Sequence, residues 1–265
     1  ANGKLIWKKR LNNKIIGEIT SIDFYKNNKY QCIFNTNSSL HIIDRNGNYV
    51  ENYPIKLPNK TKIGHSLFDY NNKKKYRIMI VGEDNMIYNL DKYGKKVIGW
   101  KYKKQNNRIL KSPKHFKFGT NDYILLETRN KTTKLLAING TQRVIFSSES
   151  IFNDSEIKIG ENGYLYAITN DAKLWKAKLD GNSTETILPN LSNESKFTVI
   201  NNNFIFSNDK KVYAIDDEFN NLFTLNFDNE IKYISSYKDY ILIETSNKLF
   251  LYNNDKIING FPIKL

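Results

Sequence analysis

The fold is decided by a stretch of the chain that reads LHIIDRNG from Leu40 to Gly47 and YPIKL from Tyr53 to Leu57. Its apolar, β-branched start is typical of a strand, and the Asp-Arg-Asn-Gly tetrapeptide that follows has the composition of a tight turn. The second half returns as another strand and carries an aromatic residue. The stretch therefore predicts a strand, a turn and a further strand.

This arrangement recurs along the chain. Close copies read IYNLDKYG at 87–94 and LFLYNND at 249–255, and a second strand containing Trp100 or Phe261 follows each of them. Weaker copies read LLAING at 135–140, LWKAKLDG at 174–181 and VYAID at 212–216. With the turns placed at 44, 91, 139, 180, 216 and 254, the copies lie 36 to 48 residues apart, which indicates a repeat architecture.

Two more strand-like runs precede most copies, for example SIDFY at 21–25 with YQCIF at 30–34, and FDY at 68–70 with YRIMIV at 76–81. No stretch has a helical period. Four short antiparallel strands per repeat predict an all-β chain, a β-propeller of four-stranded blades that forms a single domain over residues 1–265. Pro54 and Pro262 fall in the fourth strand, at the blade edge where a missing N–H group is tolerated.

The repeats around Leu40–Asp44 and Val212–Asp216 resemble those of quinoprotein-like (PQQ-type) propellers. The Gly-Phe-Pro and Gly-Trp endings resemble FG-GAP or VCBS repeats, and the combination is similar to cell-envelope propellers of Bacteroidota. The resemblance covers the whole chain. Because such repeats are short and degenerate, it identifies a propeller better than a function.

The number of blades has two interpretations. Six full repeats run from about Ile15 to Leu265, and Asn2–Leu11 reads like the fourth strand of a further blade. The chain is either a seven-bladed ring whose seventh blade has lost its inner strands, or a six-bladed ring with an extra edge strand. We favour seven blades because the chain begins at Ala1 rather than Met and stops directly after a strand, so that it can be a piece of a longer protein.

Composition excludes several classes of protein. The aromatic content of 13% argues against disorder, and a single cysteine, Cys32, excludes a disulfide scaffold. No apolar run approaches the length of a membrane span, and no signal peptide is present. The 38 Asn, 35 Lys and only 6 Arg residues fit the drift of an AT-rich genome better than selection for nucleic-acid binding, which relies on Arg.

The resemblance to FG-GAP repeats implies Ca²⁺ loops, for which the matching segments are Asp23–Asn27 and Asp69–Lys73. Each segment keeps only its first carboxylate, whereas Ca²⁺ takes about six to eight oxygen ligands. We expect metal-free turns in which the two aspartates bind backbone N–H groups. A quinone cofactor is not expected either, because vicinal cysteines and a stacking tryptophan near the axis are missing.

The remaining candidates for chemistry are isolated. His65 and His115 stand near inner strands without a third ligand in register, and Cys32 lies in an apolar strand where a buried, inert thiol is expected. The recurring aromatic residues Tyr53, Trp100 and Phe261 are expected to pack between blades. The sequence therefore predicts no catalytic, cofactor or metal site.

We expect a non-enzymatic interaction module that docks protein partners in a bacterial cell envelope, either periplasmic or associated with the outer membrane. Its partner has an acidic surface, or is an anionic membrane surface. The expected docking residues lie in the longest polar loops: Lys26, Lys29, Lys73, Lys74, Lys75, Lys101, Lys103, Lys104 and Arg108. Two alternatives remain open, a module that binds acidic glycan or lipopolysaccharide, and a hydrolase or lyase with a site in the channel.

The charge is unevenly distributed. Residues 1–135 hold 28 Lys and Arg against 10 Asp and Glu, and residues 136–265 hold 13 against 17, so that net charges of +18 and −4 give the total of +14. Drift alone would enrich lysine evenly. In a propeller this split forms a basic and an acidic sector, and the basic sector would orient the protein against an acidic surface.

The metal-free interpretation of the two aspartate loops is testable. Addition of EDTA is expected to leave the melting temperature unchanged, because Asn27 and Lys73 stand where further carboxylates would be needed. Differential scanning calorimetry with EDTA, and then with excess Ca²⁺, measures this. A fall of several degrees that Ca²⁺ reverses would contradict the interpretation.

Overall fold

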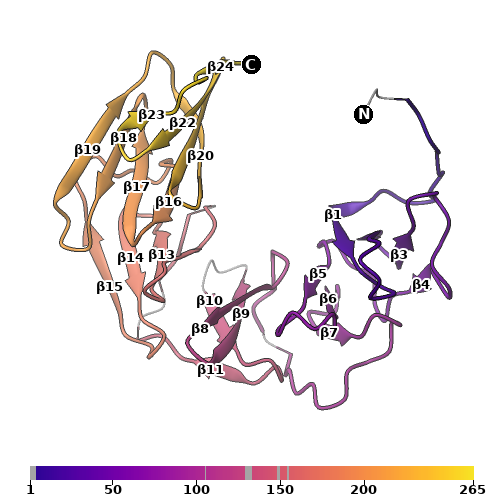
Figure 1. Cartoon of the computed structure of the whole chain (residues 1–265). Helices are drawn as coiled ribbons and strands as arrows, with labels where there is room; N and C mark the ends of the chain where they lie inside the picture. Colours follow the sequence, from indigo (N-terminus) through magenta and orange to yellow (C-terminus); the bar gives the residue numbers. More distant parts are fainter. Residues whose placement is uncertain (1–3, 105, 129–132, 148–149, 154) are drawn as a thin grey trace. The chain divides into compact units, whose positions relative to one another are not determined.

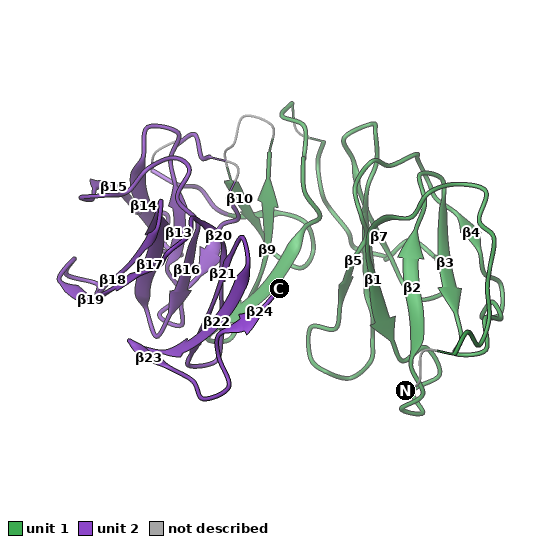
Figure 2. Ribbon diagram, turned by 90° about the horizontal axis from the view of Figure 1, so that it is seen from above, with its two compact units in different colours: residues 1–143 green, residues 144–265 purple. Residues whose placement is uncertain are grey.

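The computed structural model describes residues 4–104, 106–128, 133–147, 150–153 and 155–265, and these contain strands and turns without a helix (Figure 1). The expected all-β fold is confirmed. The chain divides into two compact units, unit 1 with residues 1–143 and unit 2 with residues 144–265 (Figure 2). The boundary nearly coincides with the change of charge, because unit 1 carries a net charge of 29 − 10 = +19 and unit 2 of 12 − 17 = −5.

The first three sheets lie in chain order. Sheet 1 consists of β1 (Ile16–Ile22), β2 (Gln31–Asn35), β3 (Ser39–Ile43) and β4 (Ile55–Lys56), sheet 2 of β5 (Ser66–Phe68), β6 (Arg77–Val81) and β7 (Ile87–Leu90), and sheet 3 of β8 (Lys114–Phe118), β9 (Asn121–Glu127), β10 (Thr133–Leu136) and β11 (Gln142–Val144). In sheet 2 the expected fourth strand is reduced to a bridge between Leu90 and Lys96.

Unit 2 repeats the plan. Sheet 4 consists of β12 (Lys158–Ile159), β13 (Leu165–Ile168), β14 (Lys173–Ala177) and β15 (Ser183–Ile187), sheet 5 of β16 (Phe197–Ile200), β17 (Asn203–Asn208), β18 (Lys211–Ile215) and β19 (Asn221–Asn226), and sheet 6 of β20 (Ile231–Tyr237), β21 (Tyr240–Thr245), β22 (Lys248–Asn253), β23 (Lys256–Ile257) and β24 (Ile263–Lys264). In sheet 6, β23 and β24 both pair with β22.

The inner strands of sheets 2 to 5 have buried residues on both faces, which explains their continuous apolar runs. In β6, Ile78 and Ile80 pack in the core shared with sheet 1, whereas Met79 and Val81 pack in the core shared with sheet 3. Side chains of a strand alternate between its two faces, so that a strand between two sheets has no solvent side. The aromatic run FIF in β17 divides in the same way between sheets 4 and 6.

The turn after the third strand recurs with the same hydrogen bonds. In sheet 1 the N–H of Gly47 donates to the carbonyl of Asp44, and the carboxylate of Asp44 accepts the N–H groups of Asn46 and Asn48. Asp91 and Asp216 act alike in sheets 2 and 5. In sheets 3 and 4 the corresponding residues are Ala137 and Lys178. The turns assigned to positions 139 and 180 from the sequence therefore begin two residues earlier.

In unit 1 a large side chain packs on the glycine of the next such turn. Ile55 packs where a Cβ at Gly94 would stand, and Trp100 does so at Gly140. The N-terminal segment forms no strand over residues 4–11, yet Trp7 covers Gly47 in this manner, and its indole N–H donates to the carbonyl of Arg45 at 2.8 Å. This contact supports the interpretation of the segment as a fourth strand, and the seven-bladed layout stays a prediction.

One expectation about the core is wrong. Cys32 is exposed rather than buried. Its neighbour Ile33 faces the core shared with sheet 2, and strand alternation turns Cys32 to the opposite face of sheet 1, where Phe34 is buried but Cys32 is not.

The turn glycines provide a test of this packing. Gly94→Ala is expected to lower the free energy of unfolding by clearly more than Gly99→Ala. Both residues have a left-handed backbone, with φ of 78° and 82°, which costs an alanine about 1–2 kcal/mol, but only the Cβ at position 94 would meet Ile55. Urea unfolding measures both, and Ile55→Ala should rescue Gly94→Ala. Equal losses at the two glycines would contradict the packing role.

Candidate functional site

Two hairpin loops of unit 1 hold most of the expected docking residues, and the buried Asp23 and the partly buried Asp69 shape them. The carboxylate of Asp23 accepts the N–H groups of Asn27 at 3.0 Å and Asn28 at 2.9 Å, and that of Asp69 accepts the N–H of Lys74 at 2.7 Å. The expectation that both aspartates bind backbone N–H groups is confirmed.

A lysine joins the two loops. The ammonium of Lys74 lies 2.5 Å from a carboxylate oxygen of Asp23 and 2.6 Å from the amide oxygen of Asn28. The side chain of Asp23 has no exposed surface. Burial would raise the pKa of Asp23, but the hydrogen bonds from Lys74 and from the backbone of Asn28 and Asn27 hold that pKa below its usual value. The ammonium of Lys74 thus supplies the positive charge beside this buried carboxylate.

Exposed lysines and tyrosines, together with the partly buried Lys92, surround this link and form what we call the lysine–tyrosine surface. Its members are Lys26, Lys29, Lys73, Lys75, Tyr25, Tyr30, Lys92 and Tyr93. The three tyrosines are 52 to 57% exposed, and the ammonium of Lys92 lies 4.7 Å from the ring centre of Phe24 and 5.0 Å from that of Tyr93. The sequence-based prediction named the lysines but not these tyrosines. Each tyrosine stands in or beside a turn, where a residue is expected to be exposed rather than part of the core.

The remaining docking candidates, Lys101, Lys103, Lys104 and Arg108, lie in the loop between sheets 2 and 3 and do not all lie at the same end of the strands. The N–H of Lys101 donates to Asn139 in the turn before β11, and the N–H of Leu110 donates to Glu127 at the far end of β9. The loop thus crosses from one end of the strands to the other. Lys104 and Arg108 therefore lie at the end opposite to the lysine–tyrosine surface, so that the expected set forms two groups. Lys103 is exposed between them.

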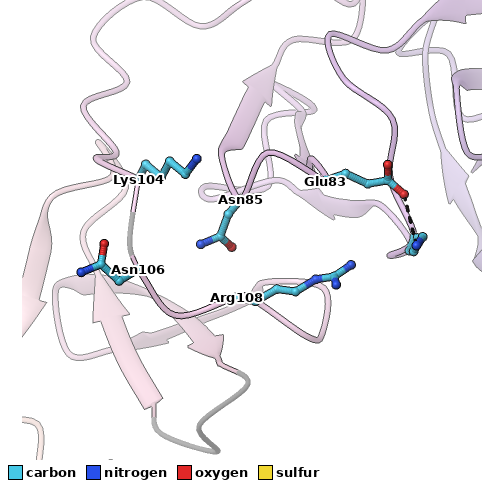
Figure 3. Close-up of a pocket in the computed structure, with 6 residues that line it drawn as sticks. Glu83, Asn85, Lys104, Asn106 and Arg108 are labelled. Atoms are coloured by element: carbon cyan, nitrogen blue, oxygen red, sulfur yellow. Dashed lines mark ion pairs between the residues drawn. The ribbon is translucent and has the colours of Figure 1, made fainter.

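Lys104 and Arg108 line a shallow basin of about 500 Å³ together with Lys62, Glu83, Asn85 and Asn106 (Figure 3). The amide of Asn85 donates to the carbonyl of Asn107 at 3.0 Å and accepts the N–H of Ile109 at 3.0 Å, which fixes the backbone on both sides of Arg108. Lys62 and Glu83 form an exposed ion pair at 3.6 Å. The basin is polar and net positive, which suits an anionic group rather than an apolar one.

A sequence signal for this end of sheet 2 was missed. The heptapeptide GEDNMIY at 82–88 recurs as GENGYLY at 160–166; the first forms the turn between the second and third strands of sheet 2, and the other the turn between the first and second strands of sheet 4. Asn85 and Gly163 occupy the same left-handed position, with φ of 65° and 79°. Asn85 therefore adopts the left-handed backbone conformation that Gly163 has in the other copy. Unlike glycine, it also has a side chain, and this side chain holds the loop before Ile109.

The three histidines lie in separate contacts. His65 is buried beside the hydroxyl of Thr20 at 2.8 Å, and burial lowers the pKa of His65 to about 4. His115 pairs with Asp122 at 2.8 Å. Within the described ranges, no group of three or more His, Cys, Asp or Glu side chains is placed to hold a metal ion.

The described residues do not include a helix with the length and apolarity needed to cross a membrane.

Comparison with solved structures identifies the fold. The chain is similar to BamB from Moraxella catarrhalis, with 16% sequence identity over 98% of this chain and 79% of that one and a TM-score of 0.61. It is also similar to BBS1N in complex with ARL6DN (9% identity, 94% and 83% coverage, TM-score 0.60) and to Hsv2p of Kluyveromyces lactis (11%, 94% and 79%, 0.57). These are β-propeller proteins, so the chain has a β-propeller fold. No family model and no curated protein matches.

The link between Lys74 and Asp23 predicts a pH-dependent effect. Lys74→Met is expected to lower the free energy of unfolding at pH 7 more than Lys73→Met, because it leaves a buried carboxylate without its ammonium. The Asp23 pKa is lowered by folding, so this carboxylate stabilises the fold above its unfolded pKa of about 4, and that contribution is lost as the pH falls through the folded pKa.

The difference between Lys74→Met and the wild type should therefore shrink when the pH falls from 7 to 3. Urea unfolding across this range measures it, with Lys73→Met as the control from the same loop. A difference that stays constant over the whole range would show that Lys74 acts through packing alone.

Proposed function

We propose that the chain is a non-enzymatic docking module that binds an acidic surface of a protein partner through the lysine–tyrosine surface. The observation that carries the proposal is the Lys74–Asp23 link, which holds two loops together and leaves Lys26, Lys29, Lys73 and Lys75 exposed around them. Tyrosine is enriched at the centres of protein interfaces, and clustered charge speeds and orients association.

Two further observations support this function. The net charge of +19 on unit 1 would attract and orient an acidic partner. One similar propeller, BBS1N, is seen in complex with another protein. The proposed setting is a bacterial cell envelope, in the periplasm or at the outer membrane. That part rests on the resemblance of the repeats to envelope propellers.

A binding experiment with matched variants tests the proposal. The probe is a fluorescein-labelled peptide of eight glutamates, and its fluorescence anisotropy is measured from 20 to 300 mM salt. Lys26, Lys29, Lys73 and Lys75 are changed together to Glu, whereas Lys74 is kept. The control changes Lys210, Lys238, Lys256 and Lys264 of unit 2, which are equally exposed. Both sets alter the net charge by the same amount, and each contains one left-handed residue, Lys26 or Lys238.

The first set is expected to weaken binding at least tenfold at 50 mM salt, and the control less than threefold. Equal effects would mean that only net charge matters and would overturn the docking surface. Vesicles of an anionic and a neutral lipid, sedimented with the same proteins, form a second arm. Binding to anionic vesicles without binding to the peptide would replace the protein partner with a membrane.

A further inference from the structure

The contact between sheets 1 and 2 shows how neighbouring sheets of this chain fill the space at their outer strands. Ile55 of β4 packs on Gly94 in the turn after β7. Tyr53 is buried in the same core, and its hydroxyl donates to the carbonyl of Lys92 at 2.7 Å. The side chains of Ile55 and Tyr53 thus fill the space beside the turn after β7. The turn leaves this space free because Gly94 has no side chain.

Sheets 4 and 5 have the same elements with different residues. Thr186 pairs with Leu174 as Ile55 pairs with Leu40, so Thr186 stands where sheet 1 has isoleucine. The tripeptide LPN follows at 188–190 as it does at 57–59, which supports this register. Strand β15 reads STETI and contributes no aromatic residue.

The turn of sheet 5 differs as well. Phe219 donates its N–H to Asp216 as Gly94 does to Asp91, so a phenylalanine occupies the glycine position. Its φ of 67° lies in the left-handed region, which is unusual for a bulky residue. Strained residues of this kind gather at functional sites.

These exchanges leave an apolar slot of about 370 Å³ between sheets 4 and 5. Phe206 and Tyr213 form one wall, where their rings stack with centroids 5.3 Å apart, and Thr186 and Leu188 lie opposite. Phe219 stands at the slot with 42% of its surface exposed. The slot lies where Ile55 packs between sheets 1 and 2. Pre-formed apolar pockets with a few polar groups are typical binding sites.

The surroundings of the slot are acidic. Residues 178–226 hold 4 Lys against 7 Asp and Glu, and Asp216, Asp217 and Glu218 stand in succession before Phe219. Asp217 pairs with Lys176 at 2.7 Å, whereas Glu218 has no ion pair within the described part of the chain. Because β15 is the last strand of sheet 4, one of its edges is open to another strand.

We propose that this slot binds one bulky apolar side chain, aliphatic or aromatic, from an extended basic segment of a partner protein. The side chain takes the place of the missing isoleucine, and the basic residues of the segment face the carboxylates before Phe219. This site is independent of the lysine–tyrosine surface and has the opposite charge preference.

The chain itself provides a probe, because its own fourth-strand segments have this chemistry. In the peptide IGWKYKK, with the sequence of residues 98–104, Trp100 is followed by one tyrosine and three lysines. It is synthesised with a fluorescein label and titrated with the full chain, and fluorescence anisotropy is measured. The same peptide with alanine for its tryptophan is the ligand control.

Thr186→Ile is the decisive variant, because it returns the isoleucine of sheet 1 and fills the slot. It is expected to weaken peptide binding at least tenfold. Thr184→Ile is the matched control on the same strand, outside the slot, and should change affinity less than twofold. A second pair does not depend on core packing: Glu218→Lys should weaken binding at least threefold, and Asp255→Lys in sheet 6 should not.

Saturable binding that requires the tryptophan and is lost with Thr186→Ile supports the proposal. No binding of the peptide to the wild type at 1 mM, or equal binding to Thr186→Ile and Thr184→Ile, would overturn it. Sedimentation velocity tests whether a second copy of the chain occupies the slot instead. Self-association of the wild type that Thr186→Ile abolishes would show that a second copy of the chain fills the slot and would overturn the partner segment.

Discussion

The whole structure depends on the burial of inner strands on both faces. Ile78 and Ile80 of β6 face one neighbouring sheet while Met79 and Val81 face the other, and all four are almost inaccessible to water. A strand in this position cannot alternate apolar and polar residues, so the sequence shows short apolar runs instead of the usual half-buried pattern. A sheet with such a strand needs a neighbour on both sides, which explains why similar strands, turns and outer-strand contacts recur along the chain.

This requirement also determines where function can lie. Because the sheet faces are used for packing, polar and charged side chains are left to the loops at the two ends of the strands. At one end the loops are fixed by the capping aspartates and by the ammonium of Lys74 on Asp23, and at the other by the amide of Asn85. Both arrangements hold exposed cations on ordered backbone, and such pre-ordering reduces the entropy that binding costs.

The fold was predictable because its signals are local and repeated. Apolar runs and turns built on Asp44 or Asp91 occur often enough to reveal the repeat, and the capping role of Asp23 follows from its place in a loop. Contacts between repeats were not predictable. Nothing in one repeat indicates that Lys74 reaches the aspartate of the preceding one, and the exposure of Cys32 depends on whether another sheet covers its face. The turns in sheets 3 and 4 were misplaced by two residues because Asn139 and Asp180 imitate the aspartate of the other copies.

The departures from the repeat carry more functional information than its regular parts. Gly94 with Ile55 and Phe219 with Thr186 are two solutions to the same contact, a small turn residue against a large strand residue and the reverse. The first solution closes the space, whereas the second leaves a slot, because a phenylalanine in the turn does not refill the volume that isoleucine occupies on the strand side. A repeat protein can therefore create a binding pocket by exchanging residues across one contact, while the strands and hydrogen bonds around it remain those of its neighbours.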